Sequence, residues 1–320
     1  MPSARFIQYG LGPIGTGIAD LAAHQGHRLV AAVDIDPAKI GRPAAAFISG
    51  APADVVITAD AATVLNAGAD IVLHSTQSRL AQVFPQLLPL VDAGLAVIST
   101  CEELAFPWIH HPVEAASLDA LARSRGVGVV GLGVNPGFVM DLLPMILTSP
   151  CRDIRRITVS RVVDVDLRRV PLQQKVGVGL PVEEFRRGVA AGRLGHIGLP
   201  QSAAMIAHAL GWTLNRIDET IEPVVGRNDV VQGVHQVCRG THGTTGEIIL
   251  DLTMAAGAQN PRDEIAVEAT PPIRAIIAGG IHGDQATYAI VVNAVPRVLA
   301  ARPGLLLPTQ LPPVAGTTRT

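Results

Sequence analysis

The chain has 320 residues, which is long enough for two domains that each have a hydrophobic core. It is 48% hydrophobic and 16% charged, with a formal net charge of −2, so its composition is globular and it lacks the positive field that nucleic-acid binding needs. Three cysteines without metal-ligand spacing predict no metal site, and their low, odd number suits a reducing cytoplasm. The first strand begins too early to leave room for a signal peptide, and no apolar run reaches the ~18 residues of a membrane helix, so we predict a cytoplasmic protein.

The first third of the chain alternates between strand patterns and helix patterns. Its strands are continuous apolar runs, which is typical of strands that are covered on both faces. We expect strands at residues 4–10, 27–36, 53–58, 69–76, 95–100 and 126–134, with helices between them at 12–26, 82–94 and 112–126. This alternation predicts a doubly wound parallel sheet, so residues 1–135 are expected to form a Rossmann domain of the α/β class.

The pattern changes after Pro136. Longer strands with partial alternation are expected at residues 153–167, 233–243, 246–258 and 263–270, and helices at 181–192 and 200–212. They predict a second, α+β domain over residues 136–283 that carries an open mixed or antiparallel sheet. Because residues 246–258 are too apolar to face water, we predict a two-fold homodimer built on this sheet.

The last part of the chain, residues 284–320, contains one long apolar helix pattern at 284–301. We expect this helix to return to the Rossmann domain. The residues after it are rich in proline and are expected to be extended or mobile.

A glycine pattern follows the first strand and opens the first helix. Gly10, Gly12 and Gly15, with Pro13 and Ile14 between them, have the spacing of a dinucleotide-binding turn. The glycines let the backbone approach a pyrophosphate, and the helix N-terminus offers its N–H groups. The alternative is an ordinary glycine turn between a strand and a helix.

Asp34 ends the second strand and is an acid at the distance from the glycine turn where a ribose diol is bound. A carboxylate there repels a 2′-phosphate. We therefore predict that the cofactor is NAD(P) and that NAD is favoured over NADP, although Lys39 and Arg42 are near enough in sequence to leave NADP open.

Small polar side chains stand where later strands of the predicted parallel sheet end. Ligands of such sheets bind beyond the carboxyl ends of the strands. The candidates for cofactor binding are Ser75, Thr76, Ser99, Thr100 and, at the predicted domain junction, Asn135. Helix capping is the alternative role for the hydroxyl groups.

Two adjacent carboxylates, Glu102 and Glu103, follow the strand at residues 95–98 and precede apolar residues. Burial of a carboxylate costs several kcal/mol unless it is paired or hydrogen-bonded, so a carboxylate at this position needs a partner or a function. On an extended segment adjacent side chains point in opposite directions, so one carboxylate can face a pocket while the other faces solvent. The alternative is that both are solvated acids of a loop.

Five segments in this order carry a family resemblance: "YGLGPIGTGIA", "STCEELAFP", "GVNPGFVMD", "GHIGLPQSAAMIAHALGW" and "AIVVNAVPRVLAARPGLL". With them the chain resembles 2,4-diaminopentanoate dehydrogenases and native amine dehydrogenases, and more remotely dihydrodipicolinate reductase. The resemblance implies a Rossmann domain, a smaller α+β domain, a homodimer, and NAD(P)-dependent interconversion of an amine with a ketone and ammonia. It assigns the catalytic acid to Glu102 or Glu103, and we prefer Glu102 as the residue nearer the strand end. Gln201 stands where the family has an acid, which leaves the substrate open.

The residues expected near a substrate are less specific. Trp108 and Met140 are candidate apolar walls, His110 and His111 are expected at the surface, and the pocket candidates are Pro136, Phe138, Arg161 and His196. A salt bridge is the alternative for Arg161, and a structural role is the alternative for His196. A reductase of C=N or C=O bonds and a non-catalytic Rossmann redox sensor remain as alternative functions.

Overall fold

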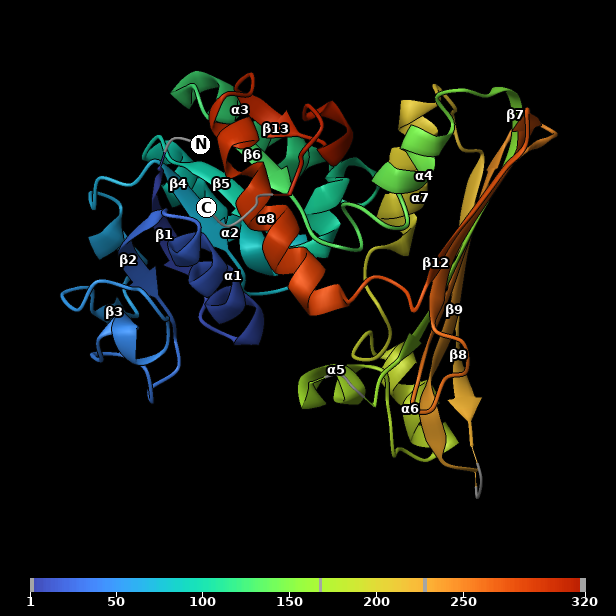
Figure 1. Ribbon diagram of the computed structural model, residues 1–320, viewed down its shortest axis with the longest axis horizontal. Coiled ribbons are helices and arrows are strands. Elements are labelled where there is room, and N and C mark those ends of the chain that lie inside the picture. The colour runs from blue at the N-terminus through green and yellow to red at the C-terminus, as the bar shows by residue number, and fades with distance from the viewer. Residues whose placement is uncertain (1–2, 167–168, 227–228, 317–320) are drawn as a thin grey trace. The chain divides into compact units, whose positions relative to one another are not determined.

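The structure is a computed structural model, and it describes residues 3–166, 169–226 and 229–316. The chain forms two compact units, one of residues 1–137 with 282–320 and the other of residues 138–281. Each unit contains one β-sheet (Figure 1). Among the described residues no helix is both long and apolar enough to cross a membrane.

The first unit contains a parallel sheet of seven strands in the order β13-β6-β5-β4-β1-β2-β3. All of its strand pairs are parallel. The strands are β1 (Arg5–Tyr9), β2 (Arg28–Val33), β3 (Ile57–Thr58), β4 (Ile71–His74), β5 (Ala96–Ser99), β6 (Gly128–Gly131) and β13 (Gly304–Leu306). Its helices are α1 (Pro13–His24), α2 (Leu80–Asp92), α3 (Pro112–Arg125) and α8 (Gly283–Leu299), with short 3₁₀ turns η1 (Ala44–Ala46), η2 (Ala61–Val64), η3 (Glu102–Ala105), η4 (Pro107–Ile109) and η6 (Pro308–Gln310).

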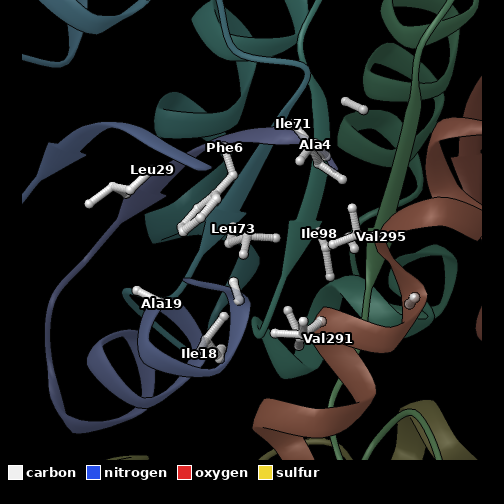
Figure 2. Packing of buried hydrophobic residues seen from close by; sticks show 14 of the residues in the cluster. Ala4, Phe6, Ile18, Ala19, Leu29, Ile71, Leu73, Ile98, Val291 and Val295 are labelled. Carbon is white, nitrogen blue, oxygen red and sulfur yellow. The ribbon is translucent and has the colours of Figure 1, made fainter. Parts of the chain in front are cut away.

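Both faces of this sheet are covered, which explains its continuous apolar strands. On one face, Phe6 and Leu73 pack with Ile18 of α1 and Val291 of α8 (Figure 2). On the other face, side chains of β1, β4 and β5 pack with those of α2 and α3. The sheet is therefore the middle layer of an α/β/α sandwich, and α8 belongs to it although it comes near the end of the chain.

The second unit contains a mixed sheet of six strands in the order β12-β11-β7-β10-β9-β8. β7 and β10 are parallel, and the other neighbours are antiparallel. The strands are β7 (Arg152–Asp164), β8 (Arg216–Val225), β9 (Val231–His242), β10 (Gly246–Ala255), β11 (Arg262–Thr270) and β12 (Ile273–Ala278), and the helices are α4 (Leu142–Leu147), α5 (Val170–Lys175), α6 (Val182–Ala190) and α7 (Leu199–Ala209).

One face of the second sheet is covered and the other is not. In β10, Ile248, Leu250 and Leu252 are buried, while the residues between them are partly exposed. α4, α6 and α7 lie on one side of the sheet, and no helix of the described residues covers the other side (Figure 1). The alternating pattern of β10 follows from this one-sided cover.

The predicted fold class, a Rossmann sheet with a second unit that carries a mixed sheet, is confirmed. Three strands were not predicted. β8 contains Pro223 and many charges, β12 is an edge strand that alternates between partly and fully exposed residues, and β13 is three residues long. In the tail that was predicted to be extended or mobile, Gly304–Leu306 are extended and pair with β6.

Candidate active site at the carboxyl edge of the first sheet

The strands of the first unit end at one edge of the sheet, because they are parallel. β1 lies between β2 and β4, which is where the strand order reverses. In open α/β sheets this reversal opens a crevice at the carboxyl ends of the strands, and ligands bind there. The residues that follow β1, β2, β4 and β5 are therefore the candidates for ligand binding.

The glycine turn between β1 and α1 is closely packed at two positions and open at the third. Gly10 has a φ of 89°, and a Cβ on it would meet the backbone carbonyl of Ser75. A Cβ on Gly15 would meet the carbonyl of Gly10, so neither position accepts another residue. A Cβ on Gly12 would meet nothing within 4 Å. Gly12 is also the N-cap of α1, so open space lies at the end of the helix where an anion is favoured.

Asp34 is buried directly after β2 and is tied to the glycine turn. Its carboxylate accepts hydrogen bonds from the backbone N–H of Leu11 at 2.6 Å and of Asp36 at 2.8 Å. Lys39 Nζ lies 3.6 Å from the carboxylate and donates to the carbonyl of Leu11 at 2.9 Å. The predicted ribose acceptor is thus oriented by two N–H groups and has a cation beside it.

The hydroxyl groups at the ends of β4 and β5 differ in what they bind. The Oγ of Ser75 is buried and has no hydrogen-bond partner among the described residues, which leaves it available to a ligand. Ser99 is fully buried, and its Oγ contacts His74 Nδ1 at 2.9 Å and accepts from the N–H of Cys101 at 3.1 Å. The Oγ1 of Thr76 donates to Gln86 at 2.8 Å. The hydroxyls of Ser99 and Thr76 therefore bind neighbouring groups of the protein, and these bonds are not the helix caps that were named as their alternative role.

His74 is a buried imidazole at the end of β4 that the prediction did not include. Its Nε2 lies 2.9 Å from Gln86 Oε1, which can only accept, so Nε2 carries the proton and Nδ1 accepts from Ser99. Burial lowers the pKa of His74 to about 4, although the bond to Gln86 opposes the shift. The ring is neutral at physiological pH and links the ends of β4 and β5.

The two carboxylates after β5 have different environments. They lie in the 3₁₀ turn η3, not on an extended segment. Glu103 is buried, at 6% exposure, and accepts from the N–H of Leu80 at 2.7 Å; His111 Nε2 lies 3.1 Å and Arg79 Nη1 3.4 Å from its oxygens. Glu102 is partly exposed. The expectation that the second carboxylate faces solvent was wrong, because Glu103 caps a helix.

The surface position expected for the two histidines holds for one of them. His110 is exposed, whereas His111 is partly buried and contacts Glu103. Trp108 is also partly buried and packs edge-on against Phe106, with ring centroids 5.3 Å apart. Sequence reasoning missed the partner of Glu103 because the pair His110–His111 carries no apolar pattern of its own.

The pocket candidate Arg161 belongs to the second unit, and there it is committed to an ion pair. Its Nη1 lies 2.6 Å from Asp263 Oδ1, and both side chains are buried. The second oxygen of Asp263 accepts from the N–H of Ile281 at 2.7 Å, and the guanidinium also donates to the carbonyl of Ile281 at 2.6 Å. The structure contains the salt bridge named as the alternative for Arg161, and the substrate-binding role of this arginine remains a prediction.

His196 is held through its backbone in the second unit. The side-chain amide of Gln236 accepts from the His196 N–H at 2.9 Å and donates to its carbonyl at 2.7 Å. Burial lowers the pKa of the imidazole to about 3, and the charges of Lys175 and Arg161 act in the same direction. The ring is therefore neutral, and it is not a cation that could bind a carboxylate.

The remaining candidate residues are distributed over both units of the chain. Asn135 and Pro136 are in the first unit, whereas Phe138 and Met140 are in the second, where Met140 is fully buried. Thr100 follows β5, and its N–H donates to the carbonyl of His74. Gln201 is buried in α7. Among the described residues no group of His, Cys, Asp or Glu could hold a metal ion.

The residues at the carboxyl edge fit a dinucleotide. The open space at Gly12, the free hydroxyl of Ser75 and the oriented carboxylate of Asp34 could hold its pyrophosphate and ribose groups. Glu102 follows β5 on the same edge and could exchange a proton with a second ligand.

The chain is similar to known dehydrogenases. The family model described as the 2,4-diaminopentanoate dehydrogenase C-terminal domain matches residues 138–318. The 2,4-diaminopentanoate dehydrogenase of Acetoanaerobium sticklandii is 32% identical over 98% of this chain and 94% of its own. The structure of an amine dehydrogenase from Mycobacterium smegmatis has a TM-score of 0.89 at 23% identity and covers 99% of this chain and 98% of that one. The WlbA dehydrogenase from Bordetella pertussis, solved in complex with NADH and UDP-GlcNAcA, has a TM-score of 0.56 at 16% identity and covers 86% and 74%.

Proposed function

The chain belongs to the 2,4-diaminopentanoate dehydrogenase family, and we propose that it catalyses the reversible, NAD(P)-dependent oxidative deamination of a small amine. In the reverse direction this reaction is the reductive amination of a ketone or aldehyde with ammonia. A substrate related to 2,4-diaminopentanoate is the first to test. The observation that carries the proposal is Glu102, a partly exposed carboxylate three positions after the end of β5, at the ligand-binding edge of the sheet.

Glu102 can perform the proton transfers that this reaction needs. In the direction of amination it takes a proton from ammonium, so that ammonia can attack the carbonyl carbon. It then gives a proton to the hydroxyl that leaves the carbinolamine, and its negative charge stabilises the iminium that results. The nicotinamide, when bound, supplies the hydride. The backbone of the glycine turn, Asp34 and Ser75 orient the dinucleotide.

The test is the consumption of NADH with a short ketone, with and without ammonium. Consumption that requires both the ketone and ammonium is the expected result. Consumption with the ketone alone would support a simple C=O reductase. NADH binding without turnover on any amine or ketone would support a redox sensor.

We propose that NAD is favoured over NADP. The Asp34 carboxylate is held by Leu11 and Asp36 with its charge toward the carboxyl edge, and it would repel a 2′-phosphate. Lys39 beside it weakens this repulsion. A higher kcat/KM for NADPH than for NADH would contradict the proposal.

We propose a two-fold homodimer built on the face of the second sheet that no described helix covers. Val162, Val237 and Ile249 alternate with buried residues there, and the salt bridges of Arg156 with Glu247 and Glu268 lie toward one end. The mixture of β-branched and paired charged groups suits a second copy of the same surface. Ile249→Asp should produce monomers in light scattering, and a wild-type chain that is monomeric at micromolar concentration would contradict the dimer.

The cytoplasm stays the proposed location, since all three cysteines are unpaired thiols.

A further inference from the structure

Glu103 is a buried carboxylate that no step of the proposed reaction uses. It caps α2 from 23 positions away, because the N–H of Leu80, the first residue of that helix, donates to its Oε2. The N-cap residue Arg79 makes no such bond with its own side chain. A carboxylate at the N-terminus of a helix is stabilised by the helix dipole as well as by the N–H group.

Two basic side chains complete the environment of this carboxylate. Arg79 Nη1 lies 3.4 Å from Oε1, and His111 Nε2 lies 3.1 Å from Oε2, to which it must donate. These partners offset the cost of burying the Glu103 carboxylate, whose side chain is almost entirely inaccessible to water.

The backbone of the turn η3 is also hydrogen-bonded to the segment that enters α2. The N–H of Glu103 donates to the carbonyl of Ser78 at 3.2 Å, and the thiol of Cys101 donates to that carbonyl at 3.2 Å. The residues on both sides of Glu102 are thus anchored to the segment that enters α2. On the strand side, Ser99 binds the N–H of Cys101 and is itself held by His74.

We propose that Glu103 is a positioning residue for Glu102. It sets the place of η3 relative to β4 and β5 and leaves Glu102 as the carboxylate that meets the substrate. This inference rests on the proposed role of Glu102 as the acid–base residue. A carboxylate displaced by about 1 Å from its working position loses on the order of 10²-fold in rate, so the anchor matters for turnover although it touches no ligand.

The test compares Glu103→Gln with a matched carboxylate elsewhere in the first unit. Asp119 of α3 binds the N–H of Leu305 at 2.8 Å and Arg123 at 2.8 Å, and so combines the same kinds of partner. We expect Glu103→Gln to lower kcat by roughly 10- to 100-fold, with the KM for the amine and the Kd for NADH unchanged. Asp119→Asn should lower the melting temperature but leave kcat unchanged. Glu103→Ala should be slower than Glu103→Gln, since the amide still accepts from Leu80.

A double-mutant cycle separates this inference from the proposed function. In a Glu102→Gln background, Glu103→Gln should have no further effect on kcat, because it acts through Glu102. If Glu102→Gln is inactive while a folded Glu103→Gln turns over at the wild-type rate, only the positioning role is wrong. If Glu102→Gln itself turns over normally, the proposed function is wrong. Should Glu103→Gln not fold, His111→Ala removes one bond, and a wild-type kcat in that variant would overturn the inference.

Discussion

The two sheets of this protein differ in strand length and in where they keep their polar groups. β1, β2, β4, β5 and β6 have four to six residues each, whereas β7 to β11 have nine to thirteen. In the first unit Asp34 and Ser75 come directly after strands, and Glu102 lies three positions after the end of β5. In the second unit Arg161, Gln236 and Asp263 are buried within strands.

The difference teaches which buried polar residues are available for chemistry. A polar group within a strand is surrounded by packed neighbours and must find a protein partner, as Arg161 does across the ladder in Asp263. A polar group just past the end of a parallel strand lies at the edge where ligands bind, as the Ser75 hydroxyl does. Four predictions test this comparison.

The largest effect is expected from Glu102→Gln, which keeps the shape of the side chain but removes its proton transfer. kcat should fall by about 10²–10⁴-fold, while the Kd for NADH should not change, because the glycine turn and Asp34 hold the dinucleotide. Steady-state kinetics and fluorescence titration measure the two quantities. Glu114→Gln, on α3, is the control that should keep wild-type turnover. Normal turnover of Glu102→Gln would remove the strand-end carboxylate from the mechanism.

Asp263→Asn should be the most destabilising change in the second unit, because it removes a carboxylate from the buried ion pair with the guanidinium of Arg161. Breaking a buried pair in this way typically costs about 3–5 kcal/mol of unfolding free energy. The exposed pair of Arg125 with Asp92, at 2.8 Å in the first unit, is the control. Asp92→Asn should cost less than about 1 kcal/mol in urea unfolding. Equal costs would mean that the Arg161 pair is not the structural element that we infer.

Stability should decrease as the pH falls from about 6.5 toward 4, because His74 has a folded-state pKa of about 4 and an ordinary value of 6.5. In this window the unfolded chain binds the proton and the folded chain does not, so the contribution is complete above pH 6.5 and is lost as the pH falls to 4. It amounts to about 3 kcal/mol in order of magnitude. His196, with a pKa of about 3, adds loss in the same direction.

The measurement for His74 is urea unfolding at several pH values. His74→Asn should flatten the decrease between pH 6.5 and 4, whereas His110→Gln, at an exposed position, should leave it unchanged. An unchanged slope in His74→Asn would mean that the ring is not the group that resists protonation.

The smallest effect concerns cofactor preference. Asp34→Ser should move the ratio of kcat/KM for NADH and NADPH toward NADPH by roughly tenfold. A change of this size corresponds to the free energy of one modest charged hydrogen bond. Lys39→Ala should move it toward NADH, because the cation at 3.6 Å no longer offsets the carboxylate. If both variants shift the ratio in the same direction, Asp34 and Lys39 do not act as opposing charges.

The elements of the first unit could be predicted because each is specified locally. Short apolar runs mark buried parallel strands, and Gly10 and Gly15 are required by close backbone contacts that no other residue permits. β8, β12 and β13 could not be found in this way. β8 and β12 are the edge strands of their sheet, and neither contains a fully buried residue, so no buried face marks them in the sequence.

By itself the sequence determined the doubly wound sheet, the glycine turn and the position of a carboxylate pair after β5, because periodicity and backbone conformation depend on neighbours in the chain. Only the tertiary structure decided which carboxylate of that pair is committed. The partners of Glu103 come from α2 and from His111, and that of Arg161 lies 102 positions away in β11. A buried charge is stabilised by whichever group the fold brings within hydrogen-bond distance, and no local pattern encodes that distance.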